Sequence, residues 1–169
     1  MRLLLFDIDG TLILTGGAGT RAMTRAFAET HGLQDALRRV EVAGRTDRLI
    51  IRDALAQAGR PFDEAGLDAF RTRYCELLRD ELESPGTGTK GALPGVLTLI
   101  DALVARDDVQ LALLTGNFRA SAEIKLAWFG LWDRFGWGVF GEEAFDREHL
   151  LPIAFERHRS LPGAPIEPP

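Results

Sequence analysis

The sequence predicts an α/β fold, in which a parallel sheet is flanked by helices and an all-helical segment is inserted after the first strand. Two observations carry this prediction. Short, continuously apolar runs end at polar or glycine-containing turns, and only helical periodicity lies between the first and second of them. The chain has 169 residues, 46% of them hydrophobic, so it can bury one sizeable core.

Three apolar runs are the candidate strands, at residues 3–6, 109–114 and, more weakly, 137–140. Runs of this length are typical of strands buried on both faces, as in parallel sheets. The first is followed by Asp7 and the second by Thr115. In open α/β sheets ligands bind beyond the carboxyl ends of the strands, so we expect the chemistry at these turns.

Helical periodicity fills residues 18–83, where three apolar stripes follow one another with no strand between them. Gly32 and Gly59 are helix stops, and Asp63 suits the N-cap of the third helix. A turn-rich linker follows at residues 84–91.

A further helix is predicted at residues 96–105, leading into the second strand. These elements divide the chain into a discontinuous core, residues 1–15 and 91–169, and a helical insertion, residues 16–90.

Charge and cysteine content exclude several classes of protein. The net charge of −5 gives no reason to expect nucleic acid or an anionic membrane as a partner. The one cysteine, Cys75, cannot form an internal disulfide, and no apolar run approaches the ~18 residues that a membrane span needs. We therefore expect a soluble, cytoplasmic protein, for which small anionic substrates remain open.

The strongest chemical signal is the stretch Asp-Ile-Asp-Gly-Thr, from Asp7 to Thr11, which follows the first strand directly. Two carboxylates at a strand end repel each other unless a cation joins them, and hard oxygen ligands suit Mg²⁺. Asp7 and Asp9 are thus the candidate metal ligands. Gly10 allows a tight turn close to a ligand, and Thr11 adds a hydroxyl donor. The alternative is a polar cap on a buried strand, without chemistry.

A second polar turn, Thr115-Gly116-Asn117, ends the second strand. A hydroxyl followed by accessible backbone N–H groups can hold a phosphate. The same residues would also suit an ordinary strand-to-helix turn.

Together these motifs resemble the haloacid dehalogenase superfamily: Asp7 to Leu12 looks like its first motif, and residues 111–117 look like its second. In that family the first Asp attacks phosphorus and forms an aspartyl-phosphate, and the second protonates the leaving oxygen and then activates water. The resemblance implies these roles for Asp7 and Asp9, and phosphate binding at Thr115. Its dehalogenases usually carry Tyr where Asp9 stands, which favours a phosphatase.

The same resemblance implies a Rossmann-like core, a helical cap and a cation that offsets the phosphate charge. Lys125, on the helix after Thr115, is one candidate for this cation, and Arg147 is the other. Either could instead be a surface charge.

The helical insertion matches the cap that many relatives carry between these two motifs. Gly44-Arg45-Thr46-Asp47 resembles the cap loop that reaches the active site. Arg45 could contact a substrate carboxylate or phosphate as a planar fork. The stretch could also simply begin the next helix, with Thr46 or Asp47 as its N-cap.

The family's fourth motif, an acidic turn after another buried strand, is missing from the sequence. After Arg159 the chain runs into a proline-rich ending, residues 161–169, with no apolar strand before it. The metal would lack one or two carboxylate ligands, and residues 3–5 would form an unpaired apolar edge at which chains associate. We expect the sequence to be a truncated version of a longer protein.

The resulting expectation is a Mg²⁺-dependent phosphomonoester hydrolase that acts on a small phosphorylated metabolite, with phosphoglycolate as the first substrate to try on family analogy. Two alternatives stay open. One is a catalytically incomplete fragment or binding module of the same fold. The other is a sugar-phosphate mutase, which would need a second phosphate contact in the cap.

Overall fold

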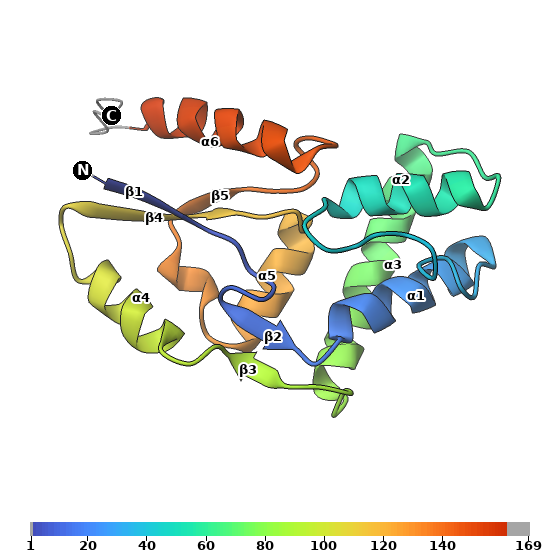
Figure 1. Ribbon diagram of the computed structural model, residues 1–169, viewed down its shortest axis with the longest axis horizontal. Helices are drawn as coiled ribbons and strands as arrows, with labels where there is room; N and C mark the ends of the chain where they lie inside the picture. The colour runs from blue at the N-terminus through green and yellow to red at the C-terminus, as the bar shows by residue number, and fades with distance from the viewer. Residues whose placement is uncertain (1, 162–169) are drawn as a thin grey trace.

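The computed structural model describes residues 2–161 and has the α/β architecture that the sequence predicts (Figure 1). A parallel sheet with helices on both faces forms one part, and three helices in succession form the other. In chain order the elements are β1 (Arg2–Phe6), β2 (Ile13–Thr15), α1 (Ala18–His31), α2 (Asp47–Gln57), α3 (Glu64–Glu83), β3 (Lys90–Ala92), α4 (Val96–Val104), β4 (Val109–Leu114), α5 (Arg119–Trp128), β5 (Trp137–Val139) and α6 (Leu150–Arg159).

The main sheet has the order β1-β4-β5, and both of its pairings are parallel. Leu4 lies opposite Leu111, and Ala112 lies opposite Trp137. All three predicted strands are therefore confirmed. Because β1 and β4 run side by side, Asp7 and Thr115 emerge at the same edge of the sheet. Within residues 2–161, β1 has a hydrogen-bonded neighbour on one side only.

Helices cover the two faces of the sheet in separate layers (Figure 1). On one face Ile8 and Leu113 pack with Ile100 of α4 and Leu126 of α5. On the other face Val139 packs with Leu150 and Ala154, at the N-terminal half of α6.

The helical insertion has its own apolar core, in which Phe27, Phe70 and Leu78 are fully buried. Its helix ends follow the sequence signals: Gly32 has φ +69° at the end of α1, and the Asp63 carboxylate accepts a 2.7 Å hydrogen bond from Gly66 N at the start of α3. Phe118, which precedes α5, is buried in the same cluster. The insertion is thus packed directly against the helix that follows the second motif.

A short antiparallel ribbon joins the two parts and was not expected from the sequence. Thr15 of β2 lies opposite Lys90 of β3, and the Lys90 ammonium donates a 2.6 Å hydrogen bond to Leu82 O. Strands of three residues are too short to show a periodicity, so β3 was absorbed into the predicted linker. The ribbon lies at the predicted boundaries between core and cap, near residues 15 and 91, and the division into core and cap stays a prediction.

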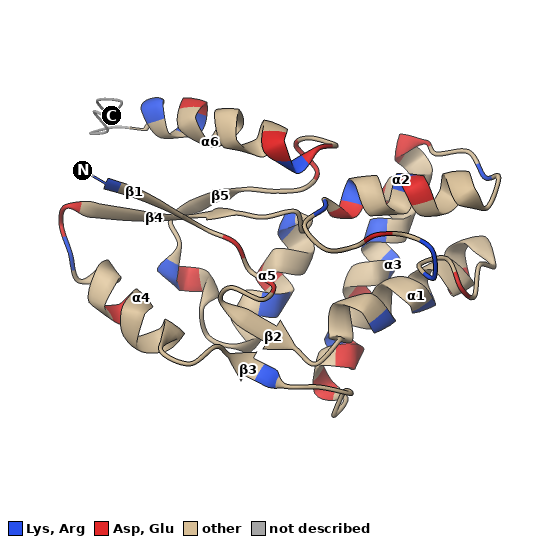
Figure 2. Ribbon diagram, in the orientation of Figure 1, with Lys and Arg blue, Asp and Glu red and all other residues tan. Residues whose placement is uncertain are grey.

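Large apolar side chains remain exposed on the helices beside β1. Leu97, Leu99 and Val104 of α4 are about half exposed, and Leu151 and Phe155 of α6 are somewhat less so. Figure 2 shows α4 as a nearly uncharged helix. A patch of exposed apolar side chains on a helix is uncommon unless another segment or a partner covers it. Among the described residues no helix is both long and apolar enough to cross a membrane.

Candidate active site

The turn after β1 places two carboxylates on the rim of one pocket. Ile8 is fully buried between Asp7 and Asp9, both of which line that pocket. Gly10 has φ +76°, a conformation that costs other residues free energy, and its N–H donates a 3.0 Å hydrogen bond to Ile13 O. Thr11 is exposed and does not line the pocket.

The turn after β4, residues 115–117, forms the second part of the site. The Thr115 side chain is completely buried, and its hydroxyl oxygen accepts a 2.8 Å hydrogen bond from the Asn117 amide. Gly116 has no room for a side chain, because a Cβ there would collide with the Arg45 carbonyl oxygen. Thr115 thus orients Asn117, while Gly116 and Asn117 reach the pocket themselves.

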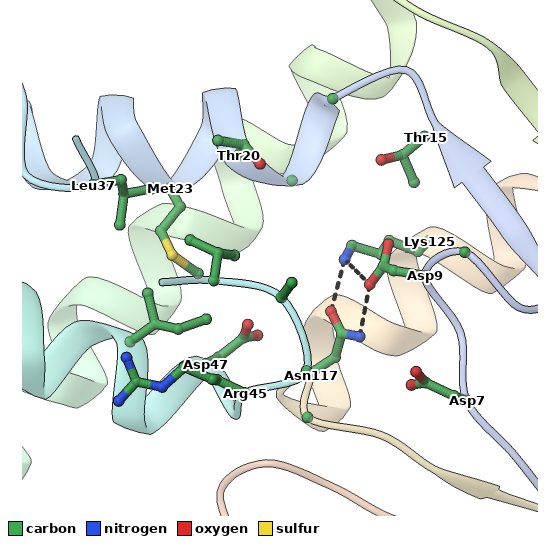
Figure 3. A pocket seen from close by; sticks show the side chains of 18 of the residues that line it. Asp7, Asp9, Thr15, Thr20, Met23, Leu37, Arg45, Asp47, Asn117 and Lys125 are labelled. Atoms are coloured by element: carbon green, nitrogen blue, oxygen red, sulfur yellow. Dashed lines mark hydrogen bonds and ion pairs between the residues drawn. The ribbon is translucent and has the colours of Figure 1, made fainter. Parts of the chain in front are cut away.

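Lys125 of α5 completes a closed set of hydrogen bonds with Asp9 and Asn117 (Figure 3). Its ammonium donates to Asp9 Oδ2 at 2.7 Å and to Asn117 Oδ1 at 2.6 Å. The Asn117 amide donates to the same Asp9 oxygen at 2.8 Å. The Lys125 side chain is only 5% exposed, and a Cβ on Gly19 would lie 3.3 Å from its nitrogen. A small residue in α1 therefore makes room for the lysine.

The electrostatics of Asp9 follow from this contact. Burial in the pocket would raise its pKa, but the Lys125 charge and the hydrogen bonds from Lys125 and Asn117 outweigh burial and hold the pKa below its usual range. Asp9 nevertheless keeps 45% of its side chain exposed, on the open side of the pocket. Without a ligand, Asp9 is therefore an ionised, accessible carboxylate at neutral pH.

Lys125 and Arg147, the two candidate cations from the sequence, contact different carboxylates. Arg147 stands in a 3-10 turn, Arg147–His149, after β5, and its guanidinium lies 2.7 Å from Asp7 Oδ2. Lys125 contacts Asp9 instead. Both line the pocket, so each carboxylate of the first motif already has a basic partner.

The pocket has a volume of about 400 Å³ and two unlike halves. The half at the end of the sheet is polar and holds Asp7, Asp9, Gly10, Gly116, Asn117, Lys125 and Arg147. The half under α1 and α2 is mostly apolar, and we call it the cap-side half: it holds Gly17, Gly19, Thr20, Met23, Leu37, Val42, Ala43, Gly44, Arg45, Asp47, Ile50 and Tyr74.

Arg45 lies in the wall of the pocket, but its guanidinium is held elsewhere. It forms an ion pair with Asp53 of α2 and donates to Glu41 O at 3.2 Å. In Figure 3 its charged end points away from Asp9 and Lys125. Thr46 is the N-cap of α2, accepting a 3.1 Å hydrogen bond from Leu49 N.

Asp47 is the pocket residue to which sequence reasoning gave no role of its own, beyond its place in the cap loop and as a possible helix N-cap. Its carboxylate accepts hydrogen bonds from Phe118 N at 2.9 Å and from the Ser121 hydroxyl at 3.3 Å. Its backbone N–H donates to Gly116 O at 2.7 Å. Burial raises its pKa to about 6, although the Lys125 charge and these hydrogen bonds oppose the rise. No local pattern marks it, because its environment comes from α5.

Asp7 and Asp9 offer the hard oxygen ligands that Mg²⁺ prefers. The chemistry of these donors fits a magnesium ion, and their number does not fill its coordination shell of about six oxygens. Residues 2–161 contain no group of three or more acidic, histidine or cysteine side chains arranged around a common metal position.

The family model that describes haloacid dehalogenase-like hydrolases matches residues 4–168, nearly the whole chain. The chain belongs to this family. Solved haloacid dehalogenase-like structures share its fold. One is a predicted phosphoglycolate phosphatase from Haemophilus somnus, with 20% identity and a TM-score of 0.58, covering 92% of this chain and 72% of its own. CbbY from Rhodobacter sphaeroides in complex with phosphate has 20% identity and a TM-score of 0.64, covering 91% and 71%.

A third neighbour is YfnB from Bacillus subtilis bound to magnesium, with 20% identity and a TM-score of 0.53, covering 98% of this chain and 76% of its own. No curated protein matches the sequence well enough to count as a relative. At these identities the neighbours show the fold of this haloacid dehalogenase-like chain, including its helical insertion, and the chemistry rests on its own residues.

Proposed function

We propose that the protein is a Mg²⁺-dependent phosphomonoesterase, which transfers the phosphoryl group of a small metabolite to Asp7 and then to water. One observation carries the proposal: Asp7 and Asp9 share a pocket with Lys125, Asn117 and Arg147. Two carboxylates, an amide and two cations around one small cavity suit a dianionic phosphate better than a neutral ligand.

Asp7 is the nucleophile in this proposal. The Asp7 carboxylate stands at the carboxyl end of β1, and its partner Arg147 reaches it from the segment after β5. Arg147 and Lys125 hold carboxylates in the ligand-free state. An arriving phosphate supplies oxygens that can take over these contacts, so Asp7 is released for attack while the phosphate charge is offset.

Asp9 serves as the general acid and then the general base. The Lys125 contact keeps it ionised before substrate binds. A phosphate dianion next to Asp9 disfavours its charged form, and it also competes for Lys125. Both effects favour the protonated form of Asp9 relative to the ligand-free state, and in this role Asp9 would carry a proton to the leaving oxygen. With the leaving group gone, the same carboxylate can accept a proton from water.

Asp7 and Asp9 would hold the magnesium ion, which when bound reduces the repulsion between these carboxylates and the phosphate. Gly116 N–H, Asn117 and Lys125 would orient the phosphate oxygens. This division leaves Thr115 with an indirect role, through its hydrogen bond to Asn117.

A second candidate function is a binding module of the same fold without turnover. It is favoured by the small number of metal ligands, because residues 2–161 supply no third carboxylate around a common metal position. Such a module would bind phosphate esters weakly and release them unchanged.

The test is an activity comparison between wild type and Asp7→Asn, both produced as the full-length gene product with any residues that follow Pro169, using p-nitrophenyl phosphate and Mg²⁺. Asn keeps the shape and can still accept a hydrogen bond from Arg147, but it cannot attack phosphorus. Asp107→Asn, the same change at an exposed position, is the matched control. We expect turnover in wild type and in the control, and none in Asp7→Asn. Activity of Asp7→Asn within tenfold of wild type would exclude Asp7 as the nucleophile, and a folded wild type without turnover would favour the binding module.

A further inference from the structure

We infer that the cap-side half of the pocket selects a leaving group that carries a hydroxyl or a cationic amine, and that Asp47 is the residue that receives it. The inference rests on the proposed function, because it concerns the part of the substrate that remains when phosphate is removed. It names a substrate class: phosphomonoesters of small alcohols without a second negative charge.

The walls of the cap-side half are mainly apolar. Met23 of α1, Ile50 of α2 and the loop residues Leu37 and Val42 contribute side chains to it. These four side chains offer no hydrogen bonds to a second phosphate or a carboxylate, and taking such a group out of water without partners is costly. Aliphatic carbons of the leaving group fit this surface.

The Asp47 carboxylate is the acidic group of the cap-side half, which the polar residues Thr20, Arg45 and Tyr74 also line. Its side chain is buried, and hydrogen bonds from the N-cap and first turn of α5 reach only one of its two oxygens: Phe118 N and Ser121 both donate to Oδ2. Among the described residues no hydrogen-bond donor contacts Oδ1. In Figure 3 the carboxylate lies within the pocket, between the apolar cap residues and Asn117. Oδ1 is not among the buried atoms that lack a hydrogen bond, and Asp47 lines the pocket, so a hydroxyl or an ammonium of a ligand can donate to this oxygen.

The cations of the pocket do not compensate for a second anion. Three basic residues line it, and each already faces an acid: Lys125 faces Asp9, Arg147 faces Asp7, and Arg45 faces Asp53. Phosphate itself can recruit Lys125 and Arg147 in the polar half. A second anion in the cap-side half would lie near the Asp47 carboxylate, and Arg45 could reach it only by leaving Asp53.

Two substrates of equal length make the test direct. O-Phosphoethanolamine and 2-phosphoglycolate both carry a phosphate on two carbons, and they differ in ending with an ammonium or a carboxylate. We expect wild type to bind and hydrolyse phosphoethanolamine at least about tenfold better, the factor that corresponds to about 1.4 kcal/mol. Calorimetric titration of both ligands into Asp7→Asn measures the same preference without turnover.

Two variants test whether Asp47 and Arg45 determine the preference between the two ligands. Asp47→Asn keeps an oxygen for the Phe118 N–H but has no charge, so the preference for the ammonium should fall by about tenfold. Asp53→Asn releases Arg45 and should shift the preference towards phosphoglycolate. Circular dichroism of each variant verifies the fold. A structural role of Asp47 alone would change the affinity for both ligands equally.

Three results would overturn the inference. Wild type could prefer phosphoglycolate, Asp47→Asn could keep the full preference for phosphoethanolamine, or Asp47→Asn could lose affinity for both ligands equally. Failure of the proposed function would look different. In that case phosphoethanolamine would still bind selectively, and no p-nitrophenyl phosphate would be hydrolysed.

Discussion

Asp47 should make the stability of the protein depend on pH, and Asp47→Asn should remove that dependence. In an exposed aspartate the pKa is 3.8, and in Asp47 burial raises it to about 6. The charged groups facing Asp47 from neighbouring elements are Lys125, which opposes the rise, and Asp9, which adds to it. Tyr74 also faces Asp47, and burial holds the pKa of its hydroxyl well above the usual range, so it stays neutral.

Proton linkage gives the direction and the size of this pH dependence of the free energy of unfolding. The folded state binds the Asp47 proton more tightly than the unfolded state, so the associated stabilisation is complete below about pH 4 and is lost as the pH rises through about 6. At about 1.4 kcal/mol per pH unit, a pKa difference of this size corresponds to about 3 kcal/mol. The free energy of unfolding of wild type should therefore fall by up to about 3 kcal/mol relative to Asp47→Asn between pH 4 and pH 7.

Urea denaturation of both proteins at matched pH values measures this difference. Subtraction cancels the contributions of all other titrating groups that the substitution leaves unchanged. Asn retains the hydrogen bond from Phe118 N, so a general loss of packing is not expected. A difference between the two proteins that stays constant across this pH range would contradict the buried, partly unpaired state of the Asp47 carboxylate.

Three further predictions concern the catalytic residues and the sheet edge. Lys125→Ala should lower the rate at least ~10²-fold, the scale for loss of one preorganised donor, and Arg147→Ala should lower it less; the reverse order in steady-state assays would transfer the main role to Arg147. Arg45→Ala should raise KM or shift substrate preference while p-nitrophenyl phosphate turnover persists; equal loss for all substrates would place Arg45 in the catalytic machinery. Residues 1–169 alone should self-associate, bind Mg²⁺ weakly and turn over little, because within residues 2–161 β1 has a neighbouring strand on one side only and α4 and α6 expose apolar side chains; a monomer by size-exclusion chromatography with full activity would refute this.

The fold was predictable where a single element carries its own signal. Residues 3–6 and 109–114 are continuous apolar runs, which are typical of the strands of a parallel sheet, although β1 is only partly buried within the described residues. Gly32 and Asp63 marked helix ends because caps are local. The β2–β3 ribbon carried no such signal, since three residues on each side cannot show a period.

The candidate site was likewise predictable where a residue's position follows from its own strand or helix. Asp7 and Asp9 could be placed from the strand before them, and Lys125 follows Asn117 by about two helical turns, which places it on the side of α5 that faces Asn117. The partner of each cation could not be predicted, because Arg147 meets Asp7 only through the path of the chain after β5. Asp47 was missed for a similar reason: the helix start is visible in the sequence, and its burial against α5 is not.

The most direct test of the account is to trap the covalent intermediate on the full-length gene product, with any residues that follow Pro169. Turnover of p-nitrophenyl phosphate is quenched, the acyl phosphate is reduced with borohydride, and the peptide that contains residue 7 is analysed by mass spectrometry. An aspartyl-phosphate at Asp7 would be reduced to homoserine at that position, which is the predicted result. Turnover with an unmodified Asp7, or with the modification at another residue, would contradict the assignment of Asp7 as the nucleophile.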